Sequence, residues 1–94
     1  MKLRIIGSAA GGGFPQWNCN YHLSRRVRDG KGGLKSRTQS SLAASAHGEN
    51  WVLFNASPDI REQISTNPVL QPRASGALRN SPIKTVVLTN ADAD

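Results

Sequence analysis

Residues 7–19, with the sequence GSAAGGGFPQWNC, follow the first apolar run of the chain, which ends at Ile6. Three consecutive glycines lie in this stretch, and glycine lets a backbone turn at positive φ or approach a ligand closely. Aromatic, polar and thiol side chains then follow, from Phe14 to Cys19. We therefore expect a strand that runs into a flexible turn and then into a segment lining a binding site. The alternative is a surface loop whose Phe14 and Trp17 side chains pack into the core.

Length and composition limit the classes of protein that the chain can represent. The chain has 94 residues, 37% of them hydrophobic, so it has room for one small domain with a marginal core. No apolar run approaches the ~20 residues of a membrane span, and no apolar signal region follows Met1, so we expect a cytoplasmic protein. Cys19 is the only cysteine, which excludes an intrachain disulfide. A formal net charge of +6 favours anionic partners but predicts no specific nucleic-acid binding.

The apolar patterns predict a mixed α/β chain. A hairpin is expected around the turn at 47–50, which would leave His47 exposed. Ser57 and Pro58 are typical of a helix start, and the residue before Pro68 ends that helix by Thr66. Leu78 is expected to anchor the irregular stretch at 69–82. We expect the strands, of which the first is buried, at 2–6, 38–46, 51–55 and 83–89.

Residues 20–37 are polar and basic, with six Lys and Arg side chains against the single acid Asp29. Because the glycine-rich half of this segment has no interleaved aromatic residue, we expect a solvated loop. The alternative is an electrostatic surface for an anionic partner.

Three places in the sequence carry side chains suited to chemistry. Cys19 and His22 have metal-ligand spacing, but the pair is only half a site. Asp59 either helps to start the helix or directs a carboxylate at the loop 7–19. Asp92 and Asp94 follow the last strand, where carboxylates form either a hard-metal or general-base site or a frayed terminus.

Four blocks of the sequence resemble a known family: GSAAGGGFPQWNCN at 7–20, RTQSSLAAS at 37–45, NASPDIREQI at 55–64 and IKTVVLTNADAD at 83–94. They are similar to the coenzyme PQQ synthesis protein B family, within the metallo-β-lactamase-like superfamily. The resemblance implies an αββα sandwich of the α/β (α+β) class. Residues 1–94 would then be the N-terminal half of a single domain, truncated within its metal motif.

The resemblance also implies site residues. The superfamily places H-x-H-x-D-H after a strand ending in Leu-Thr, so Asn90 and Asp92 stand at the first two histidine positions and Asp94 matches the aspartate. In a complete protein, Asp94 and Asp92 would be catalytic and would ligate metal, with Asn90 as a further metal ligand. The implied substrate-binding residues are Gly11, Gly12, Gly13, Gln16 and Asp59.

The cofactor implied by the resemblance is iron. Asn and Asp offer harder oxygen ligands than the imidazoles of a dizinc hydrolase. The family's C-x-C-x-x-C segment keeps only Cys19 here, with Tyr21 and Ser24 at the other two positions. Structural zinc is therefore not expected, and Cys19 with His22 would hold a metal only with ligands from elsewhere.

The implied function is pyrroloquinoline quinone (PQQ) biosynthesis, in the oxidative maturation of a Glu-Tyr-derived precursor by an iron-dependent oxygenase or hydroxylase. The isolated chain is expected to be inactive, and the complete protein could form a homodimer. The alternative from another class is a non-catalytic carrier that takes PQQ or its precursor to the periplasm, which the basic segment 25–37 favours. A phosphodiesterase-like relative is a third reading, but positions 90 and 92 lack the histidines that it needs.

Overall fold

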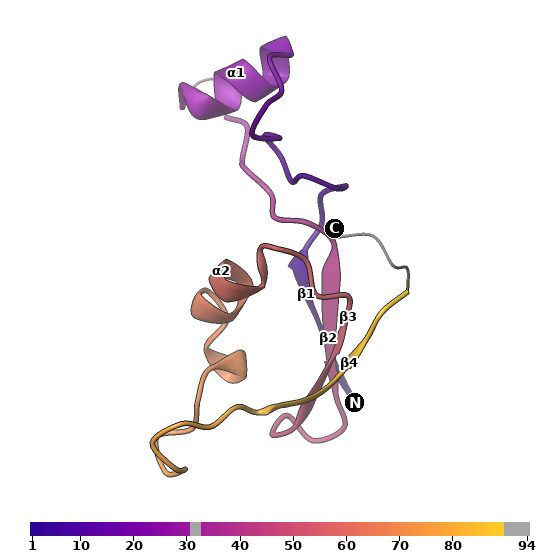
Figure 1. Ribbon diagram of the computed structural model, residues 1–94, viewed down its shortest axis with the longest axis vertical. Helices are drawn as coiled ribbons and strands as arrows, with labels where there is room; N and C mark the ends of the chain where they lie inside the picture. The colour runs from indigo at the N-terminus through magenta and orange to yellow at the C-terminus, as the bar shows by residue number, and fades with distance from the viewer. Residues whose placement is uncertain (31–32, 90–94) are drawn as a thin grey trace.

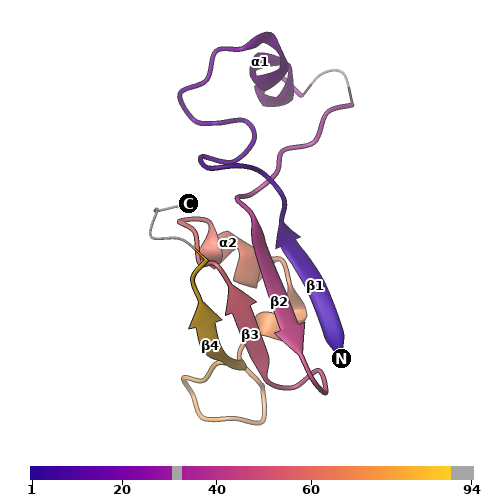
Figure 2. The same ribbon diagram turned by 90° about the vertical axis from the view of Figure 1, so that its right-hand side faces the viewer.

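A computed structural model describes residues 1–30 and 33–89 and shows one sheet, two helices and a projecting arm (Figures 1 and 2). The sheet has the order β1-β2-β3-β4, formed by Lys2–Gly7, Ser41–Ser45, Trp51–Phe54 and Ile83–Val87. β1 and β3 pair antiparallel with β2, whereas β4 pairs parallel with β3. The predicted hairpin and all four predicted strands are therefore confirmed.

Helix α2, at Ile60–Ser65, and the 3-10 turn η1, at Pro68–Leu70, connect β3 to β4 and lie against one face of the sheet (Figure 2). Ile60 and Ile64 pack against the core from this side, as their spacing predicts. The helix begins later than the sequence indicates. The Ser57 hydroxyl accepts the Asp59 N–H at 3.1 Å and so stabilises a turn, and Asp59 occupies the N-cap position.

The core lies between α2, η1 and this face of the sheet, and its buried members are Ile6, Ala43, Trp51, Leu53 and Leu70. The other face is less covered: Leu3 is 65% exposed and Ile5 is 74% exposed. The expectation of a buried first strand is thus wrong, because β1 is an edge strand covered on one side only.

The stretch between η1 and β4 is anchored by a different residue from the one predicted. Leu78 is 100% exposed, whereas Leu70 is 1% exposed and belongs to the core. Leu70 is held there because η1 follows α2 directly and turns back over the sheet.

The arm, residues 8–30 and 33–37, projects from the end of β1 and carries helix α1 at His22–Arg28 (Figure 1). The prediction of a solvated loop over residues 20–37 is wrong for these seven residues. Leu23 and Val27 are four residues apart and half-buried, so they give the helix a short apolar side. Neither helix in the described ranges is long and apolar enough to cross a membrane.

Candidate functional site

The glycine-rich loop is joined to the segment before β2 by backbone hydrogen bonds. Phe14 and Arg37 exchange two of them, with N···O distances of 2.8 Å and 2.6 Å. Ala9 donates to the Thr38 carbonyl at 2.8 Å and accepts from the Ser40 N–H at 2.8 Å. The loop and the segment before β2 therefore continue the backbone pairing of β1 and β2 irregularly beyond the end of the sheet. The loop is not an unpaired surface loop.

Glycine is required at two kinds of position in this loop. Gly12 and Gly13 have φ values of 88° and 76°, which other residues adopt only with strain. Gly7 is needed for space, since a Cβ there would lie 2.0 Å from the Gln39 carbonyl oxygen. The close approach at Gly7 brings the end of β1 against the segment that leads into β2.

Asp59 is linked to the glycine turn through Gln39. Its Oδ2 accepts hydrogen bonds from the Gln39 backbone N–H at 2.9 Å and from Gln39 Nε2 at 3.2 Å. Gln39 Oε1 in turn accepts the Gly12 N–H at 3.0 Å. Asp59 thus fixes the conformation of the loop through a neighbour, in addition to its N-cap position on α2.

Sequence reasoning missed Gln39, although a signal was available. Gln39 is buried and lies in a low-charge segment that the sequence predicts to be packed. A buried amide must find hydrogen-bond partners, and an acid elsewhere in the chain is a natural one. The same reasoning identifies buried Gln63, whose Nε2 donates to the Gln39 carbonyl at 2.8 Å.

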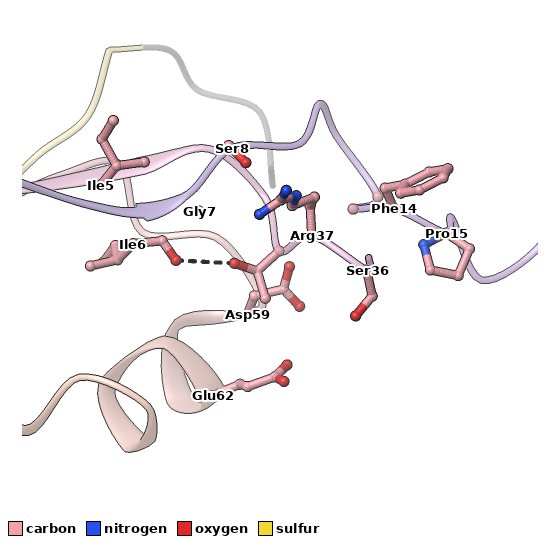
Figure 3. A pocket seen from close by; sticks show the side chains of 13 residues that line it. Ile5, Ile6, Gly7, Ser8, Phe14, Pro15, Ser36, Arg37, Asp59 and Glu62 are labelled. Atoms are coloured by element: carbon pink, nitrogen blue, oxygen red, sulfur yellow. Dashed lines mark hydrogen bonds between the residues drawn. The ribbon is translucent and has the colours of Figure 1, made fainter. Parts of the chain in front are cut away.

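A pocket of about 450 Å³ lies where the glycine turn, the end of β1 and α2 meet (Figure 3). Its size falls within the range of small-molecule sites, about 300–1,000 Å³. Polar and apolar groups both contribute to its wall, which is lined by Ile5, Ile6, Gly7, Ser8, Gly12, Gly13, Phe14, Pro15, Ser36, Arg37, Thr38, Asp59 and Glu62.

The structure brings some of the predicted site residues together at this pocket. Gly12, Gly13 and Asp59 line it, whereas Gly11 and Gln16 do not. The Gln16 side chain instead lies over Gly12, where an added Cβ would be 2.7 Å from Gln16 Cγ. The predicted residues Asn90, Asp92 and Asp94 lie outside the described residues. The functional roles assigned to all these residues stay predictions.

Cys19 and His22 lie in the arm, in different surroundings. Arg28 donates to the Cys19 carbonyl at 2.6 Å and to the Gln16 carbonyl at 2.5 Å, which holds the loop against α1. A hydrogen bond from Ser24 lowers the pKa of the Cys19 thiol, and the Tyr21 backbone and the Arg28 charge act in the same direction. The His22 ring lies 4.3 Å from the Tyr21 ring, centroid to centroid. Within residues 1–30 and 33–89, no three His, Cys, Asp or Glu side chains are grouped as metal ligands.

Comparison with known proteins defines first the class of fold. A new diphosphatase from the PhnP family matches 98% of this chain at a TM-score of 0.67 and 24% identity. At that identity the likeness concerns the fold alone. The predicted metallo-β-lactamase-like α/β class is therefore confirmed.

The particular relatives are proteins named coenzyme PQQ synthesis protein B. Those of Rhizobium meliloti (strain 1021) and Pseudomonas aeruginosa (strain LESB58) are each 54% identical to this chain over all 94 residues. The Zn²⁺-bound structure of PqqB from Methylobacterium extorquens matches the whole chain at a TM-score of 0.93 and 53% identity. No protein-family model matches. The resemblance to the protein B family is thus confirmed along the whole chain.

The chain spans about 30% of the length of these relatives, 30% of the two proteins and 31% of the solved structure. Similarity over this part establishes a shared fold and shared sequence blocks. The activity, substrates and partners of a whole protein are separate questions.

The cofactor expectation requires correction. The solved relative is bound to Zn²⁺, which points to zinc and overturns the expectation of iron without structural zinc. Iron was implied by the family resemblance and was consistent with the hardness of oxygen ligands, whereas the absence of structural zinc was expected from the missing thiols near Cys19. Zinc also accepts imidazole and carboxylate ligands, and distant parts of a chain can supply them. Thiol spacing in one segment therefore could not exclude zinc.

Proposed function

We propose that this chain serves the biosynthesis of PQQ, in the oxidative maturation of a Glu-Tyr-derived precursor. The observation that supports this most is the 54% identity, over all 94 residues of this chain, to a protein named for PQQ synthesis. The matched part includes the glycine turn, Gln39 and Asp59, which together shape the pocket. The partner would be a small molecule, PQQ or its precursor, and the place of action would be the cytoplasm.

In this proposal the chain forms one part of a single larger domain. The sheet face that carries Leu3 and Ile5 is apolar and exposed, and Val86 and Leu88 are exposed as well. Sheets in α/β proteins are normally covered on both faces. The remaining two-thirds of a protein of the relatives' length would supply that cover. The homodimer of a complete protein stays a prediction.

Zinc fits the described residues only in part. Cys19 and His22 offer a thiolate and an imidazole, both good zinc donors, but the described ranges provide no third ligand beside them. If zinc is bound, other residues must complete its coordination. In this proposal, the Asp59–Gln39 pair holds the glycine turn in place and so shapes the pocket wall against which a ligand would lie.

A chimera tests the proposed function. Residues 1–94 of this chain would replace the matching part of a full-length relative, in a strain deleted for that relative. We expect PQQ to return to the culture, measured by mass spectrometry. A stable, soluble chimera that makes no PQQ would contradict the proposal.

The same deletion strain distinguishes a function in precursor maturation from a function as a carrier. If the chimera matures the precursor, the deletion strain accumulates the precursor, and the chimera converts it to PQQ. If the chimera is a carrier, PQQ is present inside the deletion strain and only its export depends on the chimera. Extracts of cells and medium, measured separately, distinguish the two.

A further inference from the structure

A second pocket, of about 390 Å³, lies at the start of β1, whereas the pocket of the glycine turn lies at its end. Its volume is also within the range of small-molecule sites. The second pocket shares no residue with the first and is lined by Lys2, Leu3, Arg4, Gly48, Trp51 and Val69. Two of these residues are cations and none is a carboxylate, so the charge in this pocket has one sign.

The strand register places both cations on the core face of the sheet. Lys2 pairs with Ser45 and Arg4 pairs with Ala43, at the end of the sheet near the turn between β2 and β3 (Figure 2). Ser45 and Ala43 are buried. Directly paired residues of neighbouring strands project from the same face of a sheet. Because β1 is an edge strand, its two cations stand at the rim of the core, on the side of α2 and η1.

Both cations keep donors that the described part of the chain does not use. Arg4 Nε donates to Oδ1 of the buried Asn67 at 2.6 Å, which orients the guanidinium. The two terminal nitrogens of Arg4 and the Lys2 Nζ donate no hydrogen bond to other residues in the described ranges. The Lys2 side chain instead lies over Gly48, where an added Cβ would be 3.0 Å from Nζ. An oriented guanidinium with two unused NH₂ groups matches the geometry of a carboxylate.

Trp51 gives the pocket an apolar wall and a further donor. Its side chain is 3% exposed, and its Nε1 has no hydrogen-bond partner among the described residues. An indole N–H can only donate, and a buried donor without an acceptor is costly. A carboxylate oxygen that enters beside the ring would supply the missing acceptor. Trp51 and Val69 also favour a ligand with an apolar body over a bare inorganic ion.

We propose that this second pocket binds a small carboxylate that has an apolar body. Arg4 and Lys2 receive the carboxylate, and the apolar body lies against Trp51 and Val69. The proposal goes beyond the proposed function and does not rest on it, because the two pockets have no residue in common.

The test compares three probes: octanoate, 1-octanol, which lacks the charge, and acetate, which lacks the apolar body. Each is titrated into the 94-residue chain and followed by the indole N–H NMR signals of Trp51 and Trp17, the two tryptophans. Trp17 is 83% exposed and lies outside this pocket, so it is an internal control. We expect octanoate to shift the Trp51 signal and to bind at least about tenfold more tightly than either analogue. Equal binding of octanoate and octanol, an equal shift at Trp17, or no binding overturns the proposal.

Single-charge variants assign the carboxylate to its donors. Lys2→Gln and Arg4→Gln should each weaken octanoate binding by about tenfold. Lys35→Gln and Arg61→Gln remove the same charges from exposed positions outside the pocket and should leave octanoate binding unchanged. Because Lys2 holds no other residue by a hydrogen bond in the described ranges, its variant tests the site even if Arg4→Gln disturbs Asn67. Unchanged binding in Lys2→Gln contradicts the proposal.

The full-length chimera tests the pocket in a complete protein and separates this proposal from the proposed function. We expect octanoate to bind the chimera with the same dependence on Lys2. Loss of binding in the chimera would show that other parts of the protein fill the pocket, and it overturns the proposal whether or not PQQ is made. A chimera that binds octanoate but makes no PQQ contradicts only the proposed function.

Discussion

The sheet body and the arm are stabilised by different interactions. The body, residues 1–7 and 38–89, contains all five buried core residues of the described chain and buries them between α2, η1 and one face of the sheet. The arm contributes none of them and is held by backbone hydrogen bonds of Ser8 and Ala9 with residues 38–40 and, within the arm, by the contacts of Arg28. Burial stabilises the body, whereas polar contacts, which contribute less free energy each, hold the arm. Local opening should therefore begin in the arm.

We expect the largest loss of unfolding free energy from a substitution in the core of the body. Leu53→Ala removes a side chain that is 1% exposed, and the resulting cavity should lower the free energy of unfolding by about 2–5 kcal/mol. Urea denaturation followed by circular dichroism measures this. Leu78→Ala removes the same atoms from an exposed site and should change stability by less than about 0.5 kcal/mol. Similar losses in the two variants would show that this core does not stabilise the body.

The junction between body and arm is most sensitive at Gly7. In Gly7→Ala the new Cβ meets the Gln39 carbonyl at 2.0 Å and Gln63 Nε2 at 2.6 Å, so the strand must move. We expect a loss of about 3 kcal/mol, at the upper end for overpacking. In Gly30→Ala, in the arm, the new Cβ meets no atom of the described residues within 4 Å, and the variant should cost only about 1 kcal/mol, for its positive φ. A larger loss for Gly30→Ala would reverse the comparison.

Asp59 connects the two regions through Gln39. Asp59→Ala leaves the Gln39 N–H and amide without their acceptor, and we expect a loss of about 1–2 kcal/mol. Because Gln39 also holds Gly12, hydrogen exchange at the Gly12 amide should become faster. Asp29→Ala, at the exposed C-cap of α1, is the control and should leave Gly12 exchange unchanged. Unchanged exchange in the Asp59 variant would show that the glycine turn does not depend on this connection.

The body could be predicted from sequence because its signals are local. The alternation of buried and half-buried residues in β2 and β3, and the turn between them, specify a hairpin without knowledge of distant residues. The expectation that Leu78 anchors the stretch at 69–82 is wrong because no local pattern supports it. An isolated leucine in an irregular stretch has no periodic neighbours, and only the path of η1 selects Leu70 in its place.

The site was less predictable because it depends on contacts between distant segments. The sequence indicated Asp59 and the glycines separately, but their connection runs through Gln39, 20 residues before Asp59 and 27 residues after Gly12. Arg37 and Glu62 lie in two separate blocks of the sequence and share a pocket only in the fold. The cofactor could not be predicted from the Cys19 segment, since metal ligands can come from several parts of a chain.

The contacts of Arg28 should stabilise the arm locally and contribute little to the global free energy of unfolding. Arg28→Gln shortens a side chain that donates to two carbonyls, of Gln16 and Cys19, at an exposed site. Such contacts contribute less than about 1 kcal/mol, so the urea midpoint should barely move. Hydrogen exchange at residues 16–19 should nevertheless become faster, while the amides of β2 and β3 are unaffected. Arg26→Gln, on the same helix, should affect neither region, and faster exchange in β2 would contradict the independence of body and arm.

The smallest effect concerns the Cys19 thiol, whose pKa is lowered by the Ser24 hydrogen bond, the Tyr21 backbone and Arg28. Because the folded arm favours the thiolate, iodoacetamide should react with a pH midpoint below the ordinary value of 9.0, and urea should return the midpoint toward that value. The lowered pKa of the Cys19 thiol also stabilises the folded arm. This stabilisation is complete above the unfolded-state pKa and is lost as the pH falls through the lower, folded-state pKa. Equal midpoints with and without urea would mean that the arm does not hold Ser24 and Arg28 beside the thiol. A low midpoint that persists in Leu53→Ala at urea concentrations that unfold the body would instead show that the arm keeps its structure independently.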